Sequence, residues 1–169
     1  MTGAISQMQV LYNAEEDRLL FRVNTTAGQQ FRFWLTRRYC LLMLKVLKDH
    51  IDADPDVSSQ ESPLAREAVR SFKQEQAVQS ANFSDEFVED VVELPLGDQI
   101  PVAFRLTYNI RAGILNLGVQ PKSGQGINIA INQQINSSLT QLLYSAGRKG
   151  DWGITPAALG PSEGQVVIN

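Results

Sequence analysis

The strongest constraint on the fold is an apolar pattern that occurs twice, 96 residues apart. Residues 8–47 align without a gap on residues 104–143. Two segments in each copy alternate apolar and polar residues, as half-buried strands do. The matched apolar positions are Leu19, Phe21, Val23, Phe31, Phe33 and Leu35 in the first copy, and Leu115, Leu117, Val119, Ile127, Ile129 and Ile131 in the second.

Each copy therefore predicts strand, strand, strand, helix. The helices are expected to begin after Thr36 and Asn132, whose side chains can cap a helix N-terminus. The expected fold is α+β, with two pseudo-symmetric antiparallel β-meander plus helix repeats at about residues 8–51 and 104–147. Duplication explains the match, although any two meanders followed by a helix share such a pattern. Each helix could cover its own sheet, or the helices could be exchanged around a pseudo-two-fold axis.

An acidic linker separates the two copies. It begins as a loop rich in Asp, Ser and Pro and continues as an exposed helix after Ser62, in which Leu64, Ala68 and Phe72 recur at helical spacing. Residues 87–96 are expected to add a fourth strand to the second copy. The expected organisation is a single compact domain over 1–149, made of repeat 1 (5–51), the linker (52–86) and repeat 2 (87–149), followed by an extended tail (150–169).

Composition limits the class of protein. A chain of 169 residues that is 43% hydrophobic can bury one good core, and a net charge of −3 gives no chain-wide field for nucleic acid. Cys40 is the single cysteine, which excludes an internal disulfide and a cysteine zinc cluster. The apolar runs near the basic tract are too short to span a bilayer, and the first residues lack the pattern of a signal peptide, so a cytoplasmic location and no membrane partner are expected.

Charge is distributed unevenly along the chain. Residues 18–48 carry seven Lys or Arg and no Asp or Glu, whereas residues 49–98 carry thirteen acidic residues against three basic ones. If Phe21 and Phe33 pair across a hairpin, the outer face places Arg22 opposite Arg32 and Leu20 opposite Trp34. A register shifted by two residues would instead place Arg22 opposite Trp34, and in both registers Arg22, Arg32 and Trp34 share the outer face. The candidate anion-binding residues are Arg22, Arg32 and Trp34 on this face, with Arg37 and Arg38 in the first turn of the helix.

Cations beside an aromatic side chain are typical of platforms for single-stranded nucleic acid. The tandem sheet-then-helix layout, over residues 5–51 and 87–149, resembles that of Whirly and PUR-repeat proteins, which implies single-stranded nucleic-acid binding. Four other interpretations stay open for the basic face. Its charges could be simply solvated, or the middle helix or the tail could cover Trp34. The acidic segment could fold back over the arginines, or an acidic protein partner could bind them.

Motifs for catalysis or metal binding are missing from the sequence. His50 is expected at the end of a helix in a capping or surface role, and Cys40 is expected to be a buried, inert thiol. The acidic run that starts at Asp52 imitates a calcium loop, but Val57 and Pro63 replace the glycine and glutamate that such a loop needs. We expect no enzyme activity, no cofactor and no metal. The predicted function is a binding or assembly module, acting through a protein partner or a homodimer, with single-stranded nucleic-acid binding as the alternative.

Overall fold

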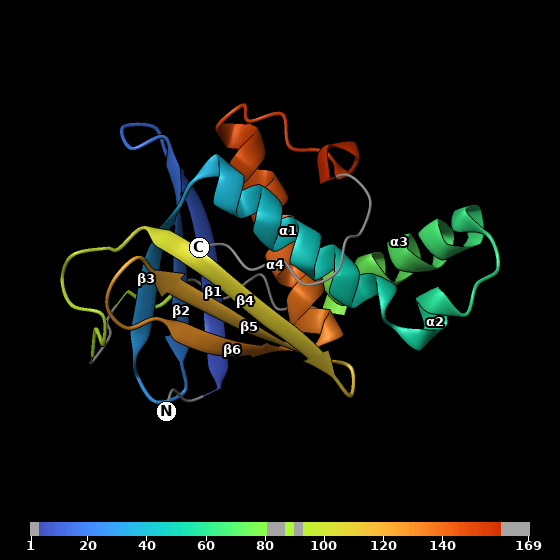
Figure 1. Ribbon diagram of the computed structural model, residues 1–169, viewed down its shortest axis with the longest axis horizontal. Coiled ribbons are helices and arrows are strands. Elements are labelled where there is room, and N and C mark those ends of the chain that lie inside the picture. Colours follow the sequence, from blue (N-terminus) through green and yellow to red (C-terminus); the bar gives the residue numbers. More distant parts are fainter. Residues whose placement is uncertain (1–3, 81–86, 90–92, 160–169) are drawn as a thin grey trace.

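The chain forms two three-stranded antiparallel sheets, and the helices at Arg37–Asp52 and Gln133–Lys149 pack on them (Figure 1). The computed structural model describes residues 4–80, 87–89 and 93–159. The strands are β1 (Ile5–Asn13), β2 (Arg18–Thr25), β3 (Gln30–Leu35), β4 (Ala103–Arg111), β5 (Ile114–Pro121) and β6 (Ile127–Ile131). The helices are α1 (Arg37–Asp52), α2 (Pro55–Ser58), α3 (Pro63–Ser80), α4 (Gln133–Lys149) and a 3-10 turn, η1 (Pro156–Leu159).

Both halves follow the predicted order of three strands and a helix, so the α+β class is confirmed. The two predicted N-caps are also present. The Thr36 hydroxyl accepts a hydrogen bond from the amide of Tyr39, and the Asn132 side chain accepts one from the amide of Ile135. These bonds satisfy amides that a helix start leaves without a partner, which is why both helices begin where the sequence indicated. A common origin of the halves stays a prediction.

Strand registers agree between the halves in the second hairpin but not in the first. Leu19 pairs with Leu35 and Leu115 with Ile131, at the predicted offset. Val23, however, pairs with Met8, whereas its counterpart Val119 pairs with Leu106, two residues beyond the aligned position.

The cause is the length of the first turn. Residues 14–17 connect β1 to β2, whereas only Ala112 and Gly113, both with positive φ, connect β4 to β5. A two-residue hairpin turn favours such left-handed backbone. The gap-free alignment is therefore wrong for the first strand, and Tyr12 and Tyr108 are not equivalent: Tyr12 lies opposite Leu19 and Tyr108 opposite Leu117.

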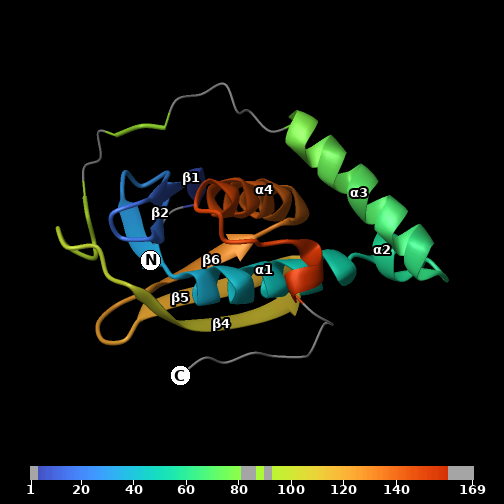
Figure 2. The same ribbon diagram turned by 90° about the horizontal axis from the view of Figure 1, so that it is seen from above.

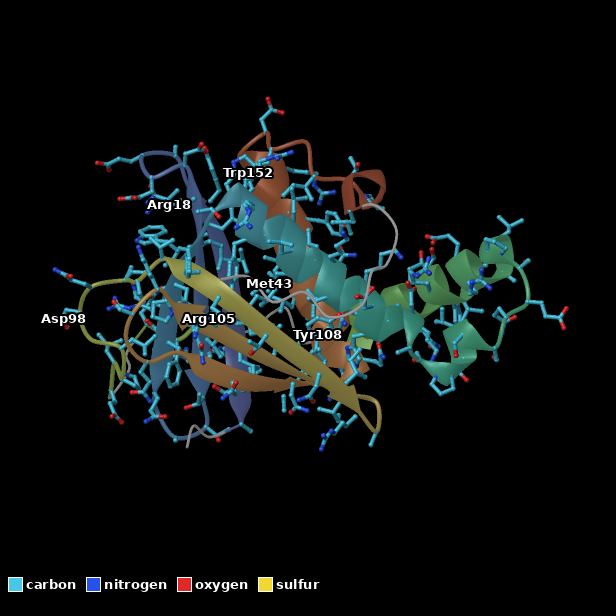
Figure 3. All side chains as sticks on the ribbon, viewed as in Figure 1. Arg18, Met43, Asp98, Arg105, Tyr108 and Trp152 are labelled. Atoms are coloured by element: carbon cyan, nitrogen blue, oxygen red, sulfur yellow. The ribbon has the colours of Figure 1, made fainter. Side chains whose placement is uncertain are left out.

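The core lies between the sheets and the helices α1 and α4. Phe33 and Ile129 are 0% and 4% exposed, which confirms the predicted inner faces. Helix α1 packs against its own β3 and against β4 of the other half, while α4 packs against its own β6 and against β1. The helices also pack on each other, with Met43 of α1 in the buried interior (Figure 3). Each half therefore needs the helix of the other half to complete its core.

The linker differs in part from its prediction. Asp54 accepts a hydrogen bond from the amide of Asp56 and caps the short α2, whose Val57 is fully buried, so this stretch is not a plain solvated loop. Helix α3 begins at Pro63 as predicted, and the Ser62 hydroxyl accepts a hydrogen bond from the amide of Ala65. Figures 1 and 2 show α3 on the side of the molecule away from the two sheets, where it contacts α4.

Two predicted extended segments lie partly outside the described residues. Of the expected strand at 87–96, residues 90–92 are not described, and in the remainder Glu93 forms one isolated parallel bridge with Gln29. In the expected tail, residues 156–159 form η1, and residues 160–169 lie outside the description.

Candidate functional site

The predicted basic face is the outer surface of the β1–β2–β3 sheet. Arg22 lies opposite Arg32 and Leu20 opposite Trp34, so the register is the one in which Phe21 pairs with Phe33 and not the one shifted by two residues. Arg22, Arg32 and Trp34 are all partly buried rather than fully exposed. Something must therefore cover this surface, because outward side chains of a two-layer fold otherwise face solvent.

Residues 87–89 cover Arg22. The Arg22 guanidinium donates hydrogen bonds of 2.7 and 3.0 Å to the two carboxylate oxygens of Glu89 and a 2.8 Å bond to Oε1 of Gln9. It also lies over the ring of Phe87, 4.5 Å from the centroid. The Arg22 side chain is only 12% exposed. Its hydrogen bonds stabilise the charged carboxylate of Glu89 and so lower the pKa of Glu89.

Residues 93–102 run beside the same sheet. Arg32 donates hydrogen bonds of 2.9 and 3.0 Å to the carbonyl oxygens of Gly97 and Asp98, in the loop before β4 (Figure 3). The backbone amides of Gln30 and Trp34 donate to the carbonyl oxygens of Glu93 and Pro101. The chain's own acidic segment thus supplies acceptors to both arginines, which is one of the interpretations that the sequence left open.

Arg37 and Arg38 lie apart from this arrangement. Arg37 donates a 2.9 Å hydrogen bond from Nε to the carbonyl oxygen of Trp152, just after α4. Arg38 is exposed, and its side chain makes no hydrogen bond or ion pair with another described residue. The structure therefore groups Arg22, Arg32 and Trp34 on one covered face and places Arg37 toward the other half.

Among the described residues, the two large apolar side chains with the greatest exposed fraction lie on α3 instead. Leu64 is 82% exposed and Phe72 is 59% exposed, and Ala68 between them is also exposed. Residues four apart share a face of a helix, so these three form one stripe. The sequence showed the spacing, but spacing alone does not tell whether a stripe faces a core or solvent. We call this surface, together with the exposed Glu67, Ser71 and Glu75, the outward face of α3.

The opposite side of α3 is attached to the body by ion pairs. Arg70 donates to Asp52 at 2.5 Å through Nη2, and Lys73 donates to Asp54 at 2.8 Å and pairs with Asp56 at 2.6 Å. Hydrogen bonding to Asp54 raises the pKa of Lys73, and the same bond helps to lower the pKa of Asp54 against the opposing effect of its burial. The helix is therefore held in place through its inner side, which leaves the outward face available.

The single cysteine and the single histidine of the chain lie in the core. Burial raises the pKa of the Cys40 thiol to about 12, so the thiol stays protonated near neutral pH. His50 is fully buried, so its expected surface role is wrong. Its burial follows from helix packing, because α1 ends against α4 and the turn between β4 and β5.

The described part of the chain was also searched for a metal site and for a membrane-spanning helix. Within the described ranges, no three His, Cys, Asp or Glu side chains are grouped so as to hold a metal ion. Of the helices that the structure describes, none has the length and apolar content needed to cross a bilayer. Comparison of the chain with protein-family models, with curated proteins and with solved structures finds no match.

Proposed function

We propose that this chain is a non-catalytic protein-interaction module that binds its partner through the outward face of α3. The observation that carries the proposal is the exposure of Leu64 and Phe72, at 82% and 59%, on one face of a single helix. Burying a side chain of this size stabilises a complex by about 1.5–3 kcal/mol. An amphipathic helix that inserts such anchors into a groove is a common mode of protein recognition.

The attachment of α3 supports the same proposal. Most of the stability of a helix in a protein comes from its packing, so a free peptide of this sequence would lose conformational entropy when it bound. Here Arg70 and Lys73 tie the helix to acidic residues of the body. The helix is therefore ordered before a partner arrives, and less of the binding energy is consumed in ordering it.

The absence of catalysis is part of the proposal. Cys40 and His50 are the residues that would most readily serve as a nucleophile or a general base. Both are 0% exposed, and the His50 ring nitrogens are engaged by a backbone carbonyl and a side-chain amide. Neither can reach a substrate in this arrangement, which favours binding over chemistry. We keep the cytoplasm as the proposed location.

Site-specific photo-crosslinking tests the proposal. A photoreactive phenylalanine analogue at Phe72 should give cross-linked products in cells, because it retains the aromatic anchor. The same analogue at Asn116, which is exposed on the outer face of β5, is the control. Sedimentation velocity of the purified chain then separates self-association from binding to another protein. Equal cross-linking from both positions, or none from residue 72, would reject the proposal.

A second candidate function is single-stranded nucleic-acid binding through Arg22, Arg32 and Trp34. The observation that favours it is the common face that these side chains share. A nucleic acid would have to displace Glu89 from Arg22, because both anions need the same guanidinium. Titration of short single-stranded DNA at several salt concentrations tests this function. Binding should appear or strengthen in Glu89→Gln, with a salt slope that changes by about 0.7 per phosphate contact.

A further inference from the structure

We infer that the partner of α3 is a protein with an apolar groove bordered by Lys or Arg side chains. This inference rests on the proposed function and names the chemistry of the partner. It follows from the way in which charge is divided between the two sides of α3.

The basic residues of α3 are turned toward the body. Arg66 donates a 3.0 Å hydrogen bond to the carbonyl oxygen of Gln60, Arg70 binds Asp52, and Lys73 binds Asp54. The Arg70 and Lys73 side chains keep 17% and 33% of their exposure. The positively charged side chains of α3 therefore bind acceptors of the same chain, on the side of the helix opposite to the outward face.

The acidic residues of α3 are turned outward. Glu67 follows Leu64 by three residues and Glu75 follows Phe72 by three residues, so each apolar anchor has a carboxylate as its neighbour on the helix surface. Both glutamates are exposed, and the Glu67 side chain keeps 62% of its exposure although it also contacts Arg70. Glu61, exposed just before the helix, extends this negative border.

The surrounding segment has the same sign. Residues 52–80 contain six Asp or Glu and three Lys or Arg, a net charge of −3. A second copy of this face would bring Glu67 and Glu75 against identical carboxylates, and like charges across an interface oppose association. A groove with a basic border would instead place cations beside both glutamates. Charge complementarity thus favours a basic partner over a homodimer.

Two synthetic amphipathic helical peptides provide the probes. Both carry the same leucine face, which one peptide borders with lysines and the other with glutamates. Fluorescence anisotropy with the full chain should show binding of the lysine peptide, weakened by salt, and binding of the glutamate peptide that is weaker by about tenfold or more. Equal affinity for both peptides, or no binding of either, would overturn the inference.

Charge-removing variants locate the effect. Glu67→Gln with Glu75→Gln should weaken binding of the lysine peptide several-fold and reduce its salt dependence. The matched control is Glu15→Gln with Glu16→Gln, which removes the same charge from exposed positions in the β1–β2 turn. If the control weakens binding equally, the peptide recognises only the net charge of the chain, and the inference fails.

Failure of the inference is distinguishable from failure of the proposed function. Leu64→Gln with Phe72→Gln removes the apolar anchors. If this variant binds the lysine peptide as well as the wild type does, the peptide does not bind through Leu64 and Phe72, and the proposed function fails. In another outcome, the wild type binds both peptides equally and the variant binds neither. Docking through the outward face of α3 would then be supported, and only the basic border of the partner's groove would be rejected. Self-association of the wild type that this variant abolishes would identify a second copy as the occupant.

Discussion

The side-chain amide of Asn136 on α4 donates a hydrogen bond to Nδ1 of His50 on α1, with 2.8 Å between the nitrogen atoms. The other ring nitrogen, Nε2, lies 2.9 Å from the carbonyl oxygen of Gly113, in the turn between β4 and β5. A carbonyl can only accept, so Nε2 carries the proton and Nδ1 is the acceptor. A neutral imidazole thus joins α1 of the first half to two elements of the second.

The stability of the protein should fall in mildly acidic solution because of His50. Burial is the main cause that lowers its pKa below 6.5, although the Gly113 carbonyl and the Asp54 carboxylate act in the opposite direction. The unfolded chain takes up a proton before the folded chain does. The contribution of this residue is therefore complete above about pH 6.5 and is lost as the pH falls toward the lowered value.

Urea unfolding at a series of pH values measures this effect. His50→Gln is the control, since it cannot titrate in this range, and the quantity to compare is the slope of unfolding free energy against pH. The carboxylates with a lowered pKa titrate at lower pH, so they do not obscure the window just below pH 6.5. Identical slopes for the wild type and the variant would show that His50 is not held neutral.

Removing the Asn136 side chain should weaken the contact between the halves. Its amide nitrogen also donates to the carbonyl oxygen of Leu47, and its oxygen accepts from the Thr140 hydroxyl. Asn136→Ala removes these two bonds and leaves the buried Nδ1 of His50 without its donor, which should lower the free energy of unfolding by about 1–3 kcal/mol. Asn116→Ala, at an exposed position, should change it by less than about 0.5 kcal/mol. Equal losses in thermal or urea unfolding would contradict the role of the Asn136 network.

Phe33 and Ile129 should contribute comparably to the core of their respective halves. Both side chains are buried on the inner faces of the sheets. Truncation of either to Ala should lower the free energy of unfolding by about 2–5 kcal/mol, since it removes apolar contacts and leaves a cavity. Asn128→Ala tests the outer face of β6 beside Ile129 and should have little effect. A loss at one site only would show that the halves fold with unequal cooperativity.

Arg22 and Glu89 should be energetically coupled. The pair makes two hydrogen bonds, and Arg22 is mostly covered, so removal of either partner alone leaves the other without its main contact. In a double-mutant cycle, Arg22→Gln and Glu89→Gln together should destabilise the protein by less than the sum of the single changes. Strict additivity in urea unfolding would indicate that residues 87–89 do not hold Arg22 in solution.

Features that depend on neighbouring residues could be read from the sequence. The alternation around Phe21 and Phe33 predicted both the inner face and the pairing of Arg22 with Arg32, because a hairpin with a short loop leaves few registers. The caps Thr36, Asn132 and Ser62 were predictable for the same reason, since a cap acts within three residues of its own position. The order of elements followed from these local signals.

Only the tertiary structure decided which surfaces are covered. The burial of His50, the contact of α1 with β4, and the cover over Arg22 join residues more than fifty positions apart, as the separation of 67 between Arg22 and Glu89 illustrates. Such contacts depend on how whole elements pack, which local periodicity does not encode. The stripe of Leu64 and Phe72 shows this most clearly. Its helical spacing is the same whether it faces a core or solvent, and the packing of the other elements leaves it exposed.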